Sequence, residues 1–224
     1  MTTARPADRE SYWDRRILQW ERARYDGRIP WRLPPVEWAA ALRPGPTRLR
    51  RTLALNMIAP YLPGRHVVEA GCGTGRLAEA IIRCGAASYV GLDVSREAVA
   101  QARRRAVEAA FIHCPATELP ENRDLVVSLG LLDWMSDEEL RAFFLKHGQA
   151  DFLHTFSERS ANPRQLAQRA FRRVAAALRP RVPRPRFLTL EHLRGLMPPA
   201  FSARARALRA PGLRDAVFIT SLPL

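Results

Sequence analysis

The sequence is poor in several features that would point to particular classes of protein. Its 224 residues contain a single lysine, Lys146, and only three cysteines, at positions 72, 84 and 114. Such wide spacing excludes a disulfide framework and a metal-binding cysteine pair, and it suits a reducing compartment. No apolar run approaches the roughly 18 residues of a membrane span, and no apolar core follows the charges at the N-terminus, as a secretory signal would require. We therefore expect a cytoplasmic protein without a membrane span or a bound metal.

Acidic residues are also scarce, with 22 against 36 basic residues, which gives a net charge of +14. A GC-rich genome would place arginines on any exposed surface, and all basic residues except Lys146 are arginine. The excess is nevertheless uneven, because the chain from Asp151 onward holds 14 arginines and four acidic residues. A field of one sign raises the local concentration of anions, whether metabolite, nucleic acid or lipid headgroup. The charge therefore indicates a partner and leaves the chemistry open.

Length and composition predict one globular domain with a small appendage. Residues 8–24 repeat large apolar side chains at helical spacing, and residues 47–61 predict a second helix that ends before a proline–glycine pair. We expect residues 1–62 to form a helical extension and residues 63–224 to form the core.

In the core, short apolar runs alternate with helical segments. The predicted strands are 66–70, 88–94, 109–114, 124–130 and 151–156, followed by a hairpin of 201–208 and 215–222. The predicted helices are 75–84, 95–108, 136–147, 163–178 and 189–197. Strands that alternate with helices and are apolar almost throughout indicate a parallel sheet covered on both faces.

The segment most informative about chemistry is VVEAGCGTGRLAEAI, residues 67–81. A buried strand ends at Glu69-Ala70, and a helix begins near Arg76. Between them lie the glycines Gly71, Gly73 and Gly75. Glycines allow positive φ and let a ligand approach the backbone at the carboxyl end of the strand, where open α/β sheets bind ligands. A dinucleotide fingerprint would need its third glycine where Arg76 stands, and the ending of a phosphate-binding P-loop is missing.

This E-x-G-x-G-x-G pattern resembles motif I of the class I S-adenosylmethionine (SAM) methyltransferases. Asp93 supports the resemblance, because it stands 18 residues after Gly75 at the end of the next predicted strand. A carboxylate there can accept hydrogen bonds from both ribose hydroxyls of an adenosyl group. The resemblance covers residues from about 50 to 160. It implies a seven-stranded Rossmann-like sheet of order 3-2-1-4-5-7-6 with strand 7 antiparallel, SAM as cofactor and S-adenosylhomocysteine (SAH) as product.

The resemblance also implies roles for single residues. Cofactor contacts fall to Glu69, the three glycines and Asp93; Val94 would pack on adenine, and Leu129 would lie near the methionine moiety. Relatives often hold the adenine amino group with an aspartate, where this chain has Pro115. The alternatives are backbone groups of Ala116 and Thr117 and the side chain of Glu118.

Two residues are candidates for catalysis. His154, on the fifth predicted strand, has an imidazole that titrates near neutrality and could act as a base, or it could be packed at the sheet edge. Asp133, after the fourth strand, could hold a substrate or cap the helix that starts near Ser136. A carboxylate or free amine as acceptor would need no base.

Acceptor contacts are expected from both ends of the chain. In the resembling family, the segment before motif I often closes over the active site, which makes Trp13, Trp20 and Trp31 candidates for an apolar wall; plain packing is the alternative. Arg159, at the start of the basic C-terminal third, is the candidate for an anionic group.

The function favoured by these patterns is methyl transfer from SAM to a small acceptor. O- or N-methylation of a bacterial metabolite, natural product or sugar is expected, as part of a biosynthetic pathway. An RNA methyltransferase and a non-catalytic SAM-binding protein are the alternatives. The sequence after the fourth strand lacks the [ND]PP[YF] pattern of base amino-group methylators, which disfavours nucleic acid. A monomer and a homodimer both remain open.

Overall fold

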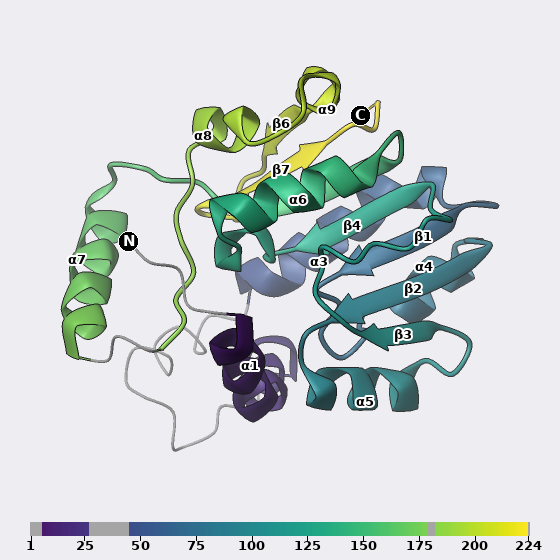
Figure 1. Ribbon diagram of the computed structural model, residues 1–224, viewed down its shortest axis with the longest axis horizontal. Helices are drawn as coiled ribbons and strands as arrows, with labels where there is room; N and C mark the ends of the chain where they lie inside the picture. The colour runs from purple at the N-terminus through teal and green to yellow at the C-terminus, as the bar shows by residue number, and fades with distance from the viewer. Residues whose placement is uncertain (1–5, 27–44, 179–181, 224) are drawn as a thin grey trace.

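A computed structural model describes residues 6–26, 45–178 and 182–223 of the chain. Its centre is a seven-stranded sheet in the order β3-β2-β1-β4-β5-β7-β6 (Figure 1). The strands are β1 (His66–Ala70), β2 (Ser88–Asp93), β3 (Ala110–His113), β4 (Leu125–Leu129), β5 (Asp151–Ser157), β6 (Arg206–Arg209) and β7 (Ala216–Thr220). Strands β1 to β5 are parallel, and β7 is antiparallel to both of its neighbours. The predicted order and the antiparallel strand are confirmed.

Helices occupy most of the predicted places. They are α1 (Pro6–Glu21), which continues into a π-helix, η1 (Arg22–Asp26), α3 (Gly45–Ile58) with η2 (Ala59–Tyr61), α4 (Ala78–Arg83), α5 (Arg96–Arg105), η3 (Leu132–Trp134), α6 (Asp137–His147), α7 (Pro163–Leu178), α8 (Leu190–Gly195) and α9 (Pro199–Arg204). Among the described residues, no helix is both long and apolar enough to cross a lipid bilayer.

The prediction of a strand over 201–208 was wrong in its first half, which forms α9. Pro199 occupies the first turn of this helix, where its fixed φ favours helical backbone. The Phe201 ring stacks on Phe152 of β5 at 4.0 Å between centroids. The alternation of arginine and alanine has the two-residue period of a strand and therefore led to the wrong prediction. Burial of Phe201 against the sheet stabilises the helix instead.

The sheet has an apolar layer on each face. One layer joins the sheet to α6, α8 and α9 through side chains such as Phe144 and Leu193. The other joins it to α3, α4 and α5 through side chains such as Ile58 and Ile81. Both faces of the central strands are therefore buried, which explains their apolar sequences.

The N-terminal helix α1 crosses the carboxyl edge of the parallel strands, beside α5 (Figure 1). Asp14 accepts a hydrogen bond from the Ser95 hydroxyl at 2.7 Å, and Arg9 donates to both carboxylate oxygens of Glu139 on α6. These contacts hold α1 above the strand ends that the glycine turn occupies.

Candidate functional site

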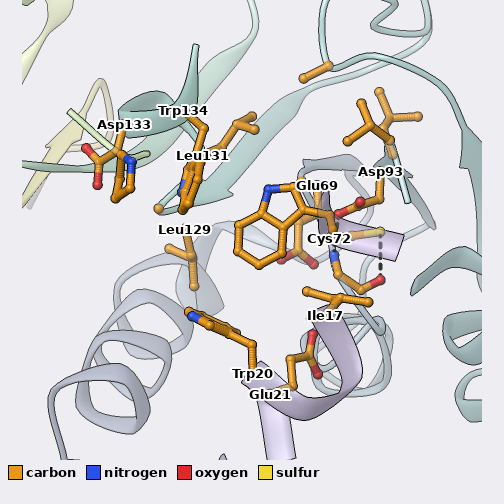
Figure 2. Close-up of a pocket in the computed structure, with 18 of the residues that line it drawn as sticks. Ile17, Trp20, Glu21, Glu69, Cys72, Asp93, Leu129, Leu131, Asp133 and Trp134 are labelled. Atoms are coloured by element: carbon orange, nitrogen blue, oxygen red, sulfur yellow. Dashed lines mark hydrogen bonds between the residues drawn. The ribbon is translucent and has the colours of Figure 1, made fainter. Parts of the chain in front are cut away.

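A cavity of about 450 Å³ lies at the carboxyl edge of the sheet, within the size range of small-molecule sites. Eleven residues that the sequence singled out line it: Trp13, Trp20, Glu69, Gly71, Gly73, Asp93, Val94, Ala116, Thr117, Leu129 and Asp133. Parallel strands bring them together because their carboxyl ends share one edge of the sheet. Figure 2 shows α1, with Trp20 and Glu21, on one side of this cavity, and Asp133 and Trp134 on another.

The backbone conformation of the turn after β1 explains why it contains three glycines. Gly71, Gly73 and Gly75 have φ values of +71°, +54° and +69°, in the left-handed region that favours glycine. A Cβ on Gly75 would lie 2.8 Å from the Phe111 ring, so this glycine serves packing and does not line the cavity. Gly71 and Gly73 bring bare backbone to the cavity wall.

Asp93 ties the end of β2 to this turn. Its Oδ2 accepts a hydrogen bond from the Gly73 N–H at 2.8 Å, and its Oδ1 accepts one from the Ser95 N–H at 2.9 Å. A carboxylate offers about four acceptor positions, so two remain for a ligand. Desolvation raises the pKa of Asp93 to about 6, opposed by these two N–H groups. The carboxylate is therefore mostly ionised at neutral pH and can receive a diol.

Glu69 is only 4% exposed on β1 and accepts a hydrogen bond from the Tyr89 hydroxyl. Burial raises the pKa of this carboxyl to about 8, and the nearby Glu21 and Asp93 charges add to the rise. Glu69 is thus mostly protonated at neutral pH in the protein alone. A cationic group placed beside it would favour its ionised form.

Glu21, at the end of α1, is a site residue that the sequence analysis missed. Its carboxylate is 5% exposed and accepts hydrogen bonds from the Thr74 N–H at 3.0 Å and from Arg76 Nε at 2.7 Å. A Cβ on Gly73 would lie 2.5 Å from Oε1 of Glu21, so the turn is glycine where α1 touches it. With Glu69 and Asp93, Glu21 makes this end of the cavity acidic.

The cavity wall also carries two arginines of α3, Arg50 and Arg51. A Cβ on Gly130, just past β4, would lie 2.8 Å from Nη1 of Arg50, so the guanidinium lies directly against this glycine. Within the described part of the chain, the buried Nε of Arg50 has no hydrogen-bond partner. A buried donor without a partner is costly, and an anion bound by the rest of this guanidinium would offset that cost.

Aromatic rings form the wall contributed by α1. The Trp13 ring centroid lies 4.8 Å from that of Trp134 and 5.9 Å from that of Trp20. Both predicted tryptophans of α1 thus line the cavity and also pack on one another. The third, Trp31, lies outside the described residues.

His154 does not reach the cavity, which corrects its choice as the catalytic base. It is fully buried on the face that α6 covers. Its Nδ1 lies 2.9 Å from the Ser128 hydroxyl and its Nε2 lies 2.9 Å from Nε2 of His147. Burial lowers the pKa of both histidines, that of His147 to about 4. This is a neutral hydrogen-bonded chain inside the core.

The other polar candidates are placed differently from what we expected. Asp133 lines the cavity, but its two oxygens accept hydrogen bonds from the N–H and the hydroxyl of Ser157, at 2.7 and 2.6 Å. It does not cap α6, because Ser136 does so itself in a capping box with Glu139. Arg159 lines a separate hollow with Arg186 and His192, away from the glycine turn.

Comparisons with known proteins agree with this geometry. Residues 67–150 match the model of a family described as "Methyltransferase domain". No curated protein matches the sequence significantly. The chain is similar to magnesium protoporphyrin IX methyltransferase (ChlM) from Synechocystis PCC 6803 with bound SAH, with 18% identity, 96% of this chain and 97% of that chain covered, and a TM-score of 0.69. A SAM-dependent methyltransferase from Mesorhizobium loti has 16% identity, 79% and 99% coverage, and a TM-score of 0.56.

At these identities the structural likeness shows the fold. Together, the sheet order, the glycine turn and the matching family model define a class I SAM-dependent methyltransferase, an enzyme whose cofactor is SAM. Within that class, residues 67–150 belong to the methyltransferase domain family.

Proposed function

We propose that this enzyme methylates oxygen or nitrogen on a small acceptor that carries a carboxylate or phosphate. The observation behind the proposal is the guanidinium of Arg50, which lies against Gly130 with a buried Nε lacking a partner among the described residues. Arginine suits these anions because its planar fork donates two parallel hydrogen bonds. The anion site of the proposal thus moves from Arg159 to Arg50.

The residues at the acidic end fit SAM, whose sulfonium supplies a methyl group on a good leaving group. Asp93 has two acceptor positions left for the ribose hydroxyls, and Gly71 and Gly73 present bare backbone. Glu69 and Glu21 suit the positive charge of the methionine moiety. Val94, Ala116 and Thr117 would border the adenine, and Leu129 the methionine moiety, as predicted.

In this proposal the protein contributes alignment and exclusion of water. Helix α1 acts as the lid and covers the cavity with Trp13 and Trp20, whereas α3 packs on the sheet as part of the core. Arg50 orients the acceptor, so that its reacting atom faces Leu129. No histidine is among the described residues of the cavity wall. An acceptor that reacts as a carboxylate or free amine needs no base and suits that wall.

Labelled SAM tests the proposal. We expect the label to enter small carboxylates or phosphates and not RNA. The variant Arg50→Met should raise the acceptor KM by about 10- to 150-fold, the equivalent of one charged hydrogen bond, and leave the SAM Kd unchanged. Arg48→Met is the matched control, because Arg48 is exposed on the same helix. Label in RNA, or equal effects of the two variants, would overturn the proposed acceptor class.

A further inference from the structure

Helix α7 lies at the side of the molecule, apart from the sheet (Figure 1). Its first turn is fixed to the end of β5 through Gln165, which is fully buried. The Gln165 side chain accepts a hydrogen bond from the Ser160 N–H at 2.5 Å and donates one to the Glu158 carbonyl at 2.8 Å. A polar residue thus faces the protein and sets how the helix is turned about its axis.

The apolar face of α7 consequently points to solvent. Leu166, Phe171 and Val174 are 48%, 52% and 61% exposed, and Ala167 and Ala170 are exposed as well. At 100° per residue, all five fall within one face of the helix. An amphipathic helix at a protein surface ordinarily buries this face, so the orientation of α7 is inverted.

Arginines border this face on both sides. Arg164 follows Phe171 around the helix, and Arg173 lies next to Leu166 on the other side. The chain from 159 to 190 contains nine arginines and not one aspartate or glutamate. An apolar face flanked by arginines in an acid-free segment has the composition of helices that lie in the interface of an anionic bilayer.

We propose that α7 binds the surface of an anionic lipid bilayer. Leu166, Phe171 and Val174 enter the boundary between headgroups and acyl chains, and Arg164 and Arg173 contact the lipid phosphates. A second copy of the chain would place arginines against arginines. Nucleic acid would use the arginines but leave the apolar face in water. The proposal does not depend on which acceptor the enzyme methylates.

Vesicle co-sedimentation of the full chain tests this. We expect binding to phosphatidylcholine mixed with phosphatidylglycerol, weakened by salt, and little binding to phosphatidylcholine alone. Changing Arg164 and Arg173 to Gln should lower the partition coefficient by about 30-fold. Changing Leu166, Phe171 and Val174 to Gln together should abolish binding, because the apolar contact with the bilayer is then lost. Leu145→Gln is the control, because Leu145 is 72% exposed on α6 and should not matter.

The outcomes are separable from protein folding and from catalysis. The variants should keep the wild-type circular dichroism and SAM affinity, which shows that α7 alone is affected. The proposal fails if neither vesicle binds, if both bind equally, or if Leu145→Gln has the same effect. It also fails if the glutamine variants abolish a dimer seen by light scattering, or lower methyl transfer to a soluble acceptor without vesicles. Those results would assign α7 to a subunit interface or to the cavity.

Discussion

Replacing Asp93 by Asn tests the cofactor site at its most informative point. The carboxylate accepts from the N–H groups of Gly73 and Ser95, and an amide can satisfy only one of them. The other N–H would face an NH₂ group, which should lower the free energy of unfolding by about 1–3 kcal/mol. The ribose would lose one acceptor and the charge, so SAM affinity should fall roughly 10- to 150-fold.

Isothermal titration calorimetry with SAM and SAH measures this effect. Both ligands carry the ribose, so their affinities should fall by the same factor. With a pKa of about 6 for Asp93, wild-type affinity should also decrease as the pH drops below 6, whereas Asp93→Asn should lack this dependence. Asp14→Asn is the control, because Asp14 also contacts Ser95 but lies outside the cavity wall. An unchanged Kd in folded Asp93→Asn, or a loss confined to SAM, would refute the reasoning.

Three further predictions concern buried titratable groups. The native pKa of Glu69 is raised to about 8, so the unfolded chain releases this proton at a lower pH than the native protein does. Between pH 5 and pH 8.5, the free energy of unfolding of the wild type, measured with urea, should therefore fall by on the order of 4 kcal/mol relative to that of Glu69→Gln. The pKa of His147 is lowered to about 4, so stability should fall as pH drops from 6.5 to 4, by on the order of 3 kcal/mol; a His147→Gln variant with the same slope would contradict this. Glu21→Gln should lower the free energy of unfolding by about 1.5–3 kcal/mol and speed proteolysis within α1, whereas Glu10→Gln, with only longer ion-pair distances of 3.4 and 3.6 Å, should do neither.

The sheet could be predicted because its information is local. Strands β1 to β5 and β7 are short apolar runs, and the glycines of the turn are required by positive φ at their own positions. The resemblance to a known family then supplied the strand order. The same local patterns placed Asp93 and Glu69 correctly at strand ends that line the cavity.

The polar partners could not be predicted because they depend on contacts between distant segments. Glu21 meets Thr74 across 53 residues, and Arg50 meets Gly130 only once α3 packs on the sheet. His154 misled us because β5 is buried on both faces, so alternation along the strand carries no polar signal for which face meets the cavity.

The docking of α1 has a consequence for the order of folding. This helix is synthesised before every element that it contacts, so Glu21 has no partner until the turn at Thr74 exists, and Arg9 has none until α6 exists. A few polar side chains and the packing of Trp13 and Ile17 hold α1, whereas a continuous ladder of backbone hydrogen bonds holds the strands. Local unfolding should therefore release α1 at much lower free energy than it releases the sheet. Cofactor and product can then exchange through an opening that leaves the core intact.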